Sequence, residues 1–351
     1  MKQSKKIILM QEEQNSGRLL YIDYLKGLSI IIVVLYHIQK CYIYSIPYIV
    51  ARVIVDPFSL VTRVFFFCSG FGLYYSHLRN PLPWTDFIKK RFVKIYLPYI
   101  IIIFICALVP YTYAGDDRLA ALLSHIFLYK MFIPKYIQSF GPYWFISSIF
   151  QYYLLFYAII KMKNKVNNNK LFLSIWIAIS LVWSILAWCF PLIREKLDWV
   201  FDACIFLHGC IFAWGMLTAE LLYQKKLVFI TVKNLLLTTC ISLGISLIAT
   251  FGTDIQNLRE IPRTIFCMCF ITIAWAISGD AIRRIFAWFG SFSFEWYLTH
   301  MLILEGLFRL TKPVGIKNLL VFCAAGLIIS AFAAWLYHQF VKRVLFSKIK
   351  M

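Results

Sequence analysis

The chain is dominated by apolar stretches that are too long and too frequent for a protein that folds in water. Of its 351 residues, 61% are hydrophobic and only 15% are charged, whereas soluble domains carry roughly 25% charged residues. A helix needs about 20 predominantly apolar residues to cross a bilayer. Stretches that approach this length are Leu28–Tyr44, Phe58–Tyr75, Ile95–Tyr113, Tyr143–Ile160, Leu171–Phe190, Val200–Leu222, Leu227–Phe251, Thr264–Ser278, Ile285–Phe308 and Asn318–Phe340. We therefore predict an all-α fold, a polytopic membrane helix bundle of about ten transmembrane helices.

The basic residues predict the orientation of these helices. The formal net charge is +20, and it lies in short clusters between apolar stretches. This distribution is typical of the positive-inside rule and of contact with anionic lipid headgroups, so we expect no nucleic acid partner. If the basic N-terminus is cytoplasmic, the basic segments Arg79–Lys94, Lys161–Lys170 and Lys342–Lys350 lie on the same side. The loops Pro191–Asp198 and Phe251–Pro262 then lie outside.

This orientation divides the chain into three parts. We expect residues 1–20 to form a cytoplasmic segment, residues 21–341 a single membrane domain, and residues 342–351 a basic cytoplasmic tail. The segment Leu119–Ile133 is apolar but short, and it carries His125 and Lys130. If it spanned the membrane, the basic segment Lys161–Lys170 would move outside, against the positive-inside rule. We therefore predict an interfacial or re-entrant helix on the outer side.

The first apolar stretch carries ionisable residues at helical spacing. Lys26 and His37 are eleven residues apart, which leaves them about 20° apart around a helix and roughly 16 Å apart along it. Asp23 lies one turn before Lys26. A histidine inside a span tends toward the bundle interior or a wet cavity, and its pKa suits it to accept a proton from a hydroxyl. A neutral histidine that makes one interhelical hydrogen bond is the alternative.

Two further groups of residues suggest binding roles. Lys90, Arg91 and Lys94 begin the third apolar stretch and form a cationic group that can hold phosphates, with ordinary cytoplasmic anchoring as the alternative. Arg63 lies inside the second stretch and needs a partner or an aqueous cavity. No His, Cys, Asp or Glu set has metal-ligand spacing, and we expect no metal. We expect the cysteines to be small buried hydrophobic residues.

The ninth stretch holds two more ionisable groups. Glu295 and His300 are five positions apart, or about 140° around a helix. We therefore expect no dyad between them on one helix, although each can meet residues of another span.

These segments together resemble the acyltransferase-3 family of integral membrane O-acyltransferases. Lys26 through His37 looks like its Arg/Lys-x10-His motif, and Phe65–Leu73 is similar to its Phe-Phe-x-x-Ser-Gly-Phe segment. Arg91–Pro98 looks like its Arg-x-x-Arg-Ile-x-Pro segment, with Lys94 at the second basic position. Gly290–His300 resembles its late Ser-Tyr/Phe-x-x-Tyr-Leu-x-His segment, and Trp144–Tyr153 is similar to its Trp-Phe stretch. The chain departs from the pattern at Ile149, where many members carry Glu.

The resemblance implies ten spans with both termini cytoplasmic, in the cell (inner, cytoplasmic) membrane. It implies an acyl-CoA donor, usually acetyl-CoA, no permanently bound cofactor, and a hydroxyl acceptor on a sugar, a glycan or a lipid-linked saccharide. With it, we assign catalytic roles to His37, Lys26 and Asp23. We assign donor binding to Arg91, Lys94, Lys90 and Arg63, and acceptor binding to Ser69, Trp144, Glu295, Tyr297 and His300. Membrane lipids are the other expected partners, and the oligomeric state stays open.

Other readings of the same residues stay open. Acyl transfer can be direct, with His37 as general base, or it can pass through a covalent acyl relay. A saccharide exporter or transporter would use the intramembrane His, Glu and Lys groups to relay protons or bind its substrate. A scaffold for glycan-synthesis enzymes would tolerate single polar substitutions in the first span.

Overall fold

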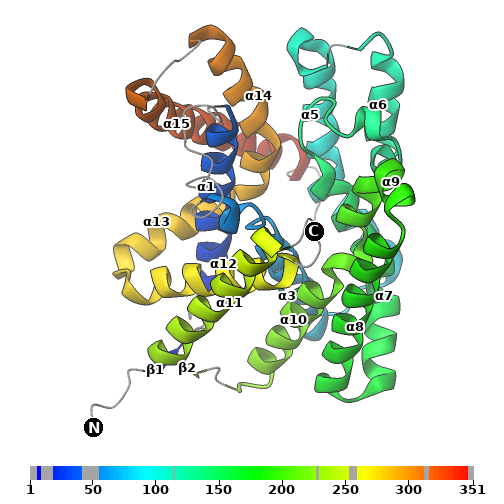
Figure 1. Ribbon diagram of the computed structural model, residues 1–351, viewed down its shortest axis with the longest axis vertical. Helices are drawn as coiled ribbons and strands as arrows, with labels where there is room; N and C mark the ends of the chain where they lie inside the picture. Colours follow the sequence, from blue (N-terminus) through cyan, green and yellow to red (C-terminus); the bar gives the residue numbers. More distant parts are fainter. Residues whose placement is uncertain are drawn as a thin grey trace. The chain divides into compact units, whose positions relative to one another are not determined.

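The computed structural model describes residues 6–8, 19–41, 55–113, 115–226, 229–252, 259–311 and 316–346. These residues are almost entirely helical (Figure 1) and form two compact units. Unit 1 comprises Met1–Asn80, Ile211–Ser293 and Gly315–Leu319. Unit 2 comprises Pro81–Cys210, Phe294–Val314 and Leu320–Met351. The prediction of an all-α fold is confirmed.

Unit 1 is built from segments that are distant in sequence. Its elements are β1 (Lys6–Ile8), α1 (Leu20–Cys41), the 3-10 helix η3 (Asp56–Phe58), α3 (Arg63–Arg79), β2 (Phe229–Thr231), α11 (Val232–Gly252), α12 (Glu260–Ile277) and α13 (Asp280–Ser291).

Unit 2 contains the middle of the chain. Its elements are α4 (Trp84–Arg91), the π-helix η4 (Phe92–Tyr96), α5 (Leu97–Leu108), η5 (Pro110–Thr112), α6 (Arg118–Ile126), η6 (Lys130–Phe132), η7 (Pro134–Tyr136), α7 (Trp144–Val166), α8 (Asn169–Cys189), α9 (Pro191–Ala203) and the π-helix η9 (Lys342–Phe346). Three helices contribute residues to both units, namely α10 (Ile205–Tyr223), α14 (Ser293–Thr311) and α15 (Ile316–Val341).

Nine helical segments in the described ranges are long and apolar enough to cross a bilayer. They are Leu20–Ile38, Asp56–Arg79, Trp84–Leu108, Trp144–Val166, Asn169–Cys189, Pro191–Tyr223, Val232–Gly252, Glu260–Ile277 and Leu320–Leu345. Helix α14 has 19 residues, about 28 Å at 1.5 Å per residue. It carries Glu295, Glu305 and Arg309, whereas each of the nine segments contains an 18-residue stretch with at most two charged residues. The chain is therefore a multi-pass membrane protein, and the side on which each terminus lies stays a prediction.

Close backbone contacts hold α1 in unit 1. A methyl group at Gly27 would overlap the carbonyl of Phe286 in α13, and one at Gly290 would overlap the carbonyl of Asp23. Only glycine allows two helices to approach this closely. Helix α13 accordingly packs against α1.

Helix α1 also packs against α12, in the opposite direction. The Tyr21 hydroxyl lies 2.7 Å from Thr272 Oγ1, and the Tyr24 hydroxyl lies 3.3 Å from Ser278 Oγ. Trp275 packs edge-on against both tyrosine rings, with centroids 5.5 and 5.2 Å apart. The start of α1 therefore lies beside the end of α12.

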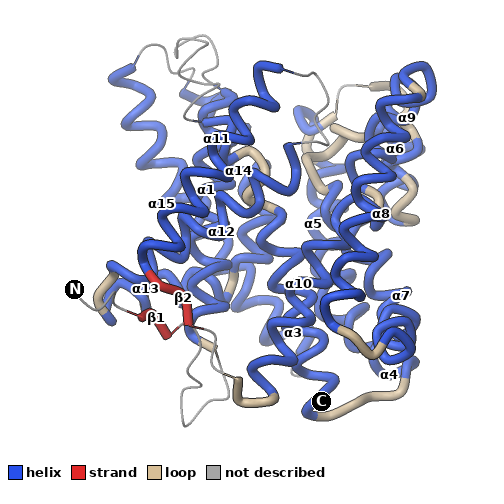
Figure 2. The backbone as a smooth tube through the Cα atoms, turned by 60° about the horizontal axis from the view of Figure 1, so that its bottom comes forward, coloured by secondary structure: helices blue, strands red, loops and turns tan. Residues whose placement is uncertain are grey.

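A short antiparallel ladder joins two distant segments of unit 1. β1 pairs with β2, with Lys6 opposite Thr231 and Ile8 opposite Phe229. Figure 2 shows these strands in red, and they are the only strands in the part of the chain that the structure describes. Residues 1–5 and 9–18 of the predicted N-terminal segment, residues 253–258 of the predicted outer loop, and residues 347–351 of the predicted tail lie outside the described residues.

The short segment that follows α5 does not form a spanning helix. Helix α6 has 9 residues, about 14 Å, against a hydrocarbon core of about 30 Å. The 3-10 turns η6 and η7 then end the regular helix before α7 begins. The prediction of a short, non-spanning helix is confirmed, and its position on the outer side stays a prediction.

Two boundaries predicted from the sequence are wrong. The stretch Ile285–Phe308 is not one span, because Phe292 leaves the helical conformation (φ −126°, ψ 20°) between α13 and α14. Apolar residues continue across this break, so hydropathy does not reveal it. The predicted loop Pro191–Asp198 is helical and belongs to α9, with Pro191 in the first turn, where a missing N–H costs nothing.

We predict that Gly27→Ala destabilises the protein by about 1–3 kcal/mol, because the added methyl overlaps a backbone carbonyl that cannot rotate away. Gly72→Ala is the matched control, since nothing lies within 4 Å of a methyl at Gly72. Both changes gain the same helix propensity, about 1 kcal/mol. Thermal unfolding of the purified variants measures the difference, and equal melting temperatures would contradict the prediction.

Candidate functional site

The first charged pair of α1 joins two residues that lie one helical turn apart. Lys26 Nζ lies 3.0 Å from Asp23 Oδ1, and the two side chains are 31% and 16% exposed. Three residues along a helix bring such side chains onto one face. Asp23 also lies in the first turn, where the helix dipole favours a negative charge. Asp23 therefore both anchors the cation of Lys26 and stabilises the start of α1.

His37 lies near the other end of the same helix and is half-buried. Its Nδ1 lies 2.9 Å from the carbonyl oxygen of Val33. A carbonyl oxygen only accepts, so Nδ1 carries the hydrogen in this arrangement. In the neutral ring Nε2 then keeps its lone pair, which is the form that a general base requires. The ring of Tyr36 packs edge-on against His37, with centroids 5.7 Å apart.

Helix α3 brings the Ser-Gly segment to α1. The two helices pack together, and Cys68 lies within electrostatic range of both Lys26 and Asp23. Ser69, the next residue, is half-buried. Gly70 makes a close approach to the carbonyl of Phe212 in α10. Unit 1 therefore gathers Asp23, Lys26 and the Ser69 segment near the start of α1.

Arg63 lies elsewhere in unit 1. It begins α3 and forms a two-point ion pair with Glu260 at the start of α12, in which Nη2 lies 3.2 Å from Oε2. Both side chains are almost fully buried. Because α12 runs opposite to α1, its start lies away from the Lys26 end of α1. Arg63 and Lys26 are therefore not brought together.

The basic segment of unit 2 is centred on a π-helical turn. Lys90 and Arg91 end α4, and Lys94 lies in η4, within electrostatic range of both. Pro98 lacks the N–H that would bond to the carbonyl of Lys94, which explains why the ladder is irregular here. The Arg91 guanidinium lies over the rings of Phe87 and Tyr153, 5.3 and 6.0 Å from their centroids. Such turns occur frequently at functional sites.

The late motif on α14 is held by hydrogen bonds within unit 2. Glu295 Oε1 lies 3.1 Å from Nδ1 of His338 in α15. The Tyr297 hydroxyl donates to the carbonyl of Pro142 at 2.6 Å, and His300 Nδ1 lies 2.7 Å from the carbonyl of Tyr297. Glu295 therefore meets a residue of another helix.

Trp144 begins α7 and packs near a histidine of α10. Its ring centroid lies 6.1 Å from that of His208, whose Nε2 lies 3.0 Å from the carbonyl oxygen of Asp202. Trp144 also packs against Met131 and Ile137. Trp144 therefore belongs to a cluster of aromatic and apolar side chains within unit 2.

Residues 19–338 match the acyltransferase-3 family model, which describes an acyltransferase domain. The chain belongs to this family. No curated protein and no solved structure gave a match. Its family and its spanning helices together make the protein a multi-pass membrane acyltransferase.

The acyltransferase buries Ile149, the residue at which its sequence departs from the family motif. Ile149 is 1% exposed and lies in the first half of α7. The isoleucine side chain packs among its neighbours and supplies no charged group to the site. Among the described residues, no group of three His, Cys, Asp or Glu side chains can hold a metal ion.

Sequence reasoning missed a buried polar cluster that follows α5. His125, fully buried, lies 2.9 Å from the Tyr99 hydroxyl through Nδ1 and 3.1 Å from Ser139 Oγ through Nε2. Lys130 is also fully buried, with Nζ 3.5 Å from the carbonyl of Ile137 and 5.7 Å from the centroid of the Tyr143 ring. Burial lowers the pKa of both His125 and Lys130 well below their ordinary values. The apolar character of this segment was the only sequence signal of such burial.

The lowered pKa of Lys130 predicts a pH-dependent stability. Below the ordinary lysine pKa of about 10.4, the unfolded chain binds a proton that folded Lys130 lacks. Stability must then rise with pH in that range, by up to about 1.4 kcal/mol per pH unit. We expect the melting temperature of the acyltransferase to rise more between pH 8 and pH 10 than that of Lys130→Met.

Lys135→Met is the control for this measurement. Lys135 is exposed, and Asp117, 2.5 Å away, raises its pKa. We therefore expect Lys135→Met to keep the wild-type rise of the melting temperature with pH. A Lys130→Met variant with the wild-type pH profile would show that Lys130 stays protonated in the folded protein.

Proposed function

We propose that this acyltransferase transfers an acetyl group from acetyl-CoA to a hydroxyl of a sugar, a cell-surface polysaccharide or a lipid-linked glycan. One observation carries the proposal. The hydrogen bond from His37 Nδ1 to the carbonyl oxygen of Val33 leaves the lone pair of the neutral ring on Nε2. By its helical spacing, His37 also lies on the same face of α1 as the Asp23–Lys26 pair. A base and a fixed cation on one helix suit acyl transfer to an alcohol.

The proposed reaction is a direct transfer. The acceptor oxygen attacks the thioester carbon, and its proton passes to His37 Nε2. The bond between the acyl carbon and sulfur then breaks, and the CoA thiolate takes the proton from the imidazolium. An ester and CoA are the products, and the neutral imidazole is restored. Positioned general-base catalysis of this kind contributes about 10²- to 10⁴-fold in rate.

The donor would bind through its phosphates at the basic segment of unit 2. Lys90, Arg91 and Lys94 supply cationic donors there, and guanidinium groups bind phosphates with two parallel hydrogen bonds. Arg63 fits this role poorly, because phosphate binding would require it to leave its buried pair with Glu260. Breaking such a pair leaves an uncompensated buried charge, at a cost of several kcal/mol.

The acceptor would use the hydroxyl and aromatic groups that the motifs supply. Ser69, Trp144, Tyr297, His300 and the Glu295–His338 pair are the proposed contacts. Since the donor is cytoplasmic and the acceptor is a surface glycan, we place the protein in the cytoplasmic (inner) membrane.

The central experiment is reconstitution. The purified protein in nanodiscs is supplied with acetyl-CoA and a glycolipid extract, and free CoA and acetylated glycan are measured. Stoichiometric release of CoA and formation of an acetyl ester are expected. Saccharide movement across vesicle membranes without CoA release would instead identify a transporter.

His37→Ala tests the base. We expect the transfer rate to fall by about 10²- to 10⁴-fold, with normal expression and folding. His77→Ala is the matched control, because His77 of α3 is also half-buried but stacks on Tyr74, with ring centroids 6.3 Å apart. Normal product from His37→Ala would remove His37 from the mechanism.

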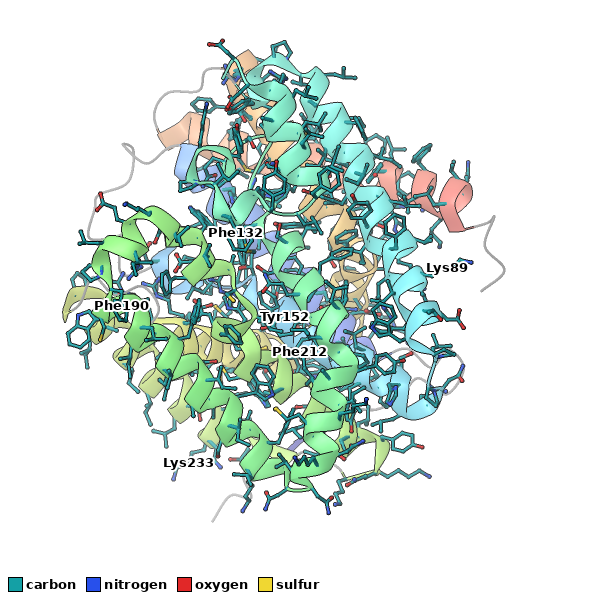
Figure 3. All side chains as sticks on the ribbon, turned by 90° about the vertical axis from the view of Figure 1, so that its right-hand side faces the viewer. Lys89, Phe132, Tyr152, Phe190, Phe212 and Lys233 are labelled. Carbon is teal, nitrogen blue, oxygen red and sulfur yellow. The ribbon has the colours of Figure 1, made fainter. Side chains whose placement is uncertain are left out.

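Arg91→Gln tests the donor site. Loss of a charge-assisted hydrogen bond costs about 1.5–3 kcal/mol, so we expect KM for acetyl-CoA to rise at least about tenfold while the acceptor KM is unchanged. Lys89→Gln is the control, since Lys89 is exposed and projects away from the helices in Figure 3. An unchanged KM for acetyl-CoA in Arg91→Gln would exclude this segment as the phosphate site.

A further inference from the structure

Helix α13 has an exposed apolar face that the packing of unit 1 leaves uncovered. Ile282, Ile285 and Trp288 are 47%, 54% and 51% exposed, and their positions lie within about 120° of one another around the helix. The opposite face contains the buried residues Ala287 and Gly290 and packs against α1. The proposed mechanism uses neither the exposed apolar face nor the residues beside it.

A polar strip runs along α13 between these two faces. It consists of Asp280, Arg284 and Ser291, which lie within about 40° of one another around the helix. A helix with an apolar face and an adjoining charged face typically lies in the plane of the membrane surface, with its apolar side chains at the boundary of the acyl chains. Tryptophan is enriched at the same depth, and Trp288 lies on the apolar face next to this strip.

The length and the neighbours of α13 also place it at the membrane surface. Helix α12 is long and apolar enough to span, so its last residue, Ile277, lies at one face of the bilayer. Helix α13 begins three residues later and has 12 residues, about 18 Å, against a hydrocarbon core of about 30 Å. The helix then breaks at Phe292, and α14 is long enough to cross by itself. Helix α13 therefore stays at the face where α12 ends.

The two arginines of α13 differ in their contacts. The Arg283 guanidinium lies over the Trp275 ring, 4.5 Å from its centroid, and Nε donates to the Trp275 carbonyl. Its Nη1 also pairs with Asp280 at 3.2 Å. Arg284 is exposed, and in the described part of the chain it makes no hydrogen bond or ion pair. Arg284 is therefore a cation at the membrane surface that no carboxylate of the described chain neutralises.

We propose that α13 is a binding surface for an anionic phospholipid of the bilayer. Arg284 binds the headgroup phosphate, to which a guanidinium can donate two parallel hydrogen bonds. Ile285 and Trp288 contact the acyl chains, and Trp288 lies one turn beyond Arg284, where side chains on a helix are neighbours. An anionic headgroup is preferred to a zwitterionic one, because it brings no cation of its own to compete with Arg284. This inference uses no residue of the proposed reaction.

Quenching of tryptophan fluorescence by brominated lipids tests the surface directly. The full-length protein is placed in nanodiscs of phosphatidylcholine that contain either brominated phosphatidylglycerol or the same content of brominated phosphatidylcholine. Bromine on an acyl chain quenches tryptophans that the chain contacts, and the difference between the wild type and Trp288→Phe isolates the signal of Trp288. We expect the brominated phosphatidylglycerol to quench Trp288 more than the brominated phosphatidylcholine does.

The Arg284→Gln variant assigns the headgroup contact. One arginine near an anionic surface contributes about a fivefold increase in binding, so we expect the preference for phosphatidylglycerol to fall by about that factor. Arg309→Gln is the matched control, because Arg309 is 56% exposed but already pairs with Glu305. The melting temperature in phosphatidylcholine checks that each variant folds. If Arg284→Gln does not fold, the comparison of the two brominated lipids on the wild-type protein still decides.

Equal quenching of Trp288 by the two brominated lipids would overturn the proposal, and so would a preference that survives Arg284→Gln. A Trp288 that neither lipid quenches would also overturn it, because the face would then be covered by protein, and a dimer in the nanodisc would identify a second copy as the cover. None of these measurements reads acetyl transfer, so the lipid surface and the proposed function stand or fall separately.

Discussion

The close backbone contact between α1 and α13 is the constraint on which the charged face of α1 depends. Gly27 and Gly290 allow each helix to reach a carbonyl of the other, at Phe286 and Asp23. This contact fixes the rotation of α1 about its axis. If α1 turned about its axis by one residue position, 100°, the Asp23–Lys26 pair and His37 would all leave their present neighbours, because the three residues lie on one rigid helix. The position of the candidate base is thus set by packing rather than by its own hydrogen bond.

Helix α1 also separates two kinds of electrostatic environment. At its start, Lys26 is partly exposed and is paired with Asp23, an arrangement that costs little. Near its end, Arg263 of α12 is almost fully buried and lies within electrostatic range of Asp56 and Glu260. The antiparallel packing of α1 and α12 produces this separation, since it places Thr272 beside the start of α1 and Arg263 near its end.

The sequence predicted those features that local periodicity or composition can encode. Hydropathy located most spanning helices, and the spacing of Lys26 and His37 predicted their shared face. Hydropathy missed the break between α13 and α14 at Phe292, because apolar residues continue through this break. The pairing of Arg63 with Glu260 joins residues 197 positions apart, so no local pattern contains it. Without that pairing, an arginine inside a span looks like a ligand-binding group, and this is why the sequence alone grouped Arg63 with the donor site.

The chemistry of the cation decides how each buried positive group is accommodated. Lys130 and Arg263 are both buried and both have only neutral hydrogen-bond partners in the described part of the chain. The amine of Lys130 can become neutral, and burial lowers its pKa accordingly, so it needs no counter-ion. The guanidinium of Arg263 keeps its charge at any accessible pH. Only the second group therefore stays charged when buried, among three hydroxyls and within electrostatic range of Asp56 and Glu260.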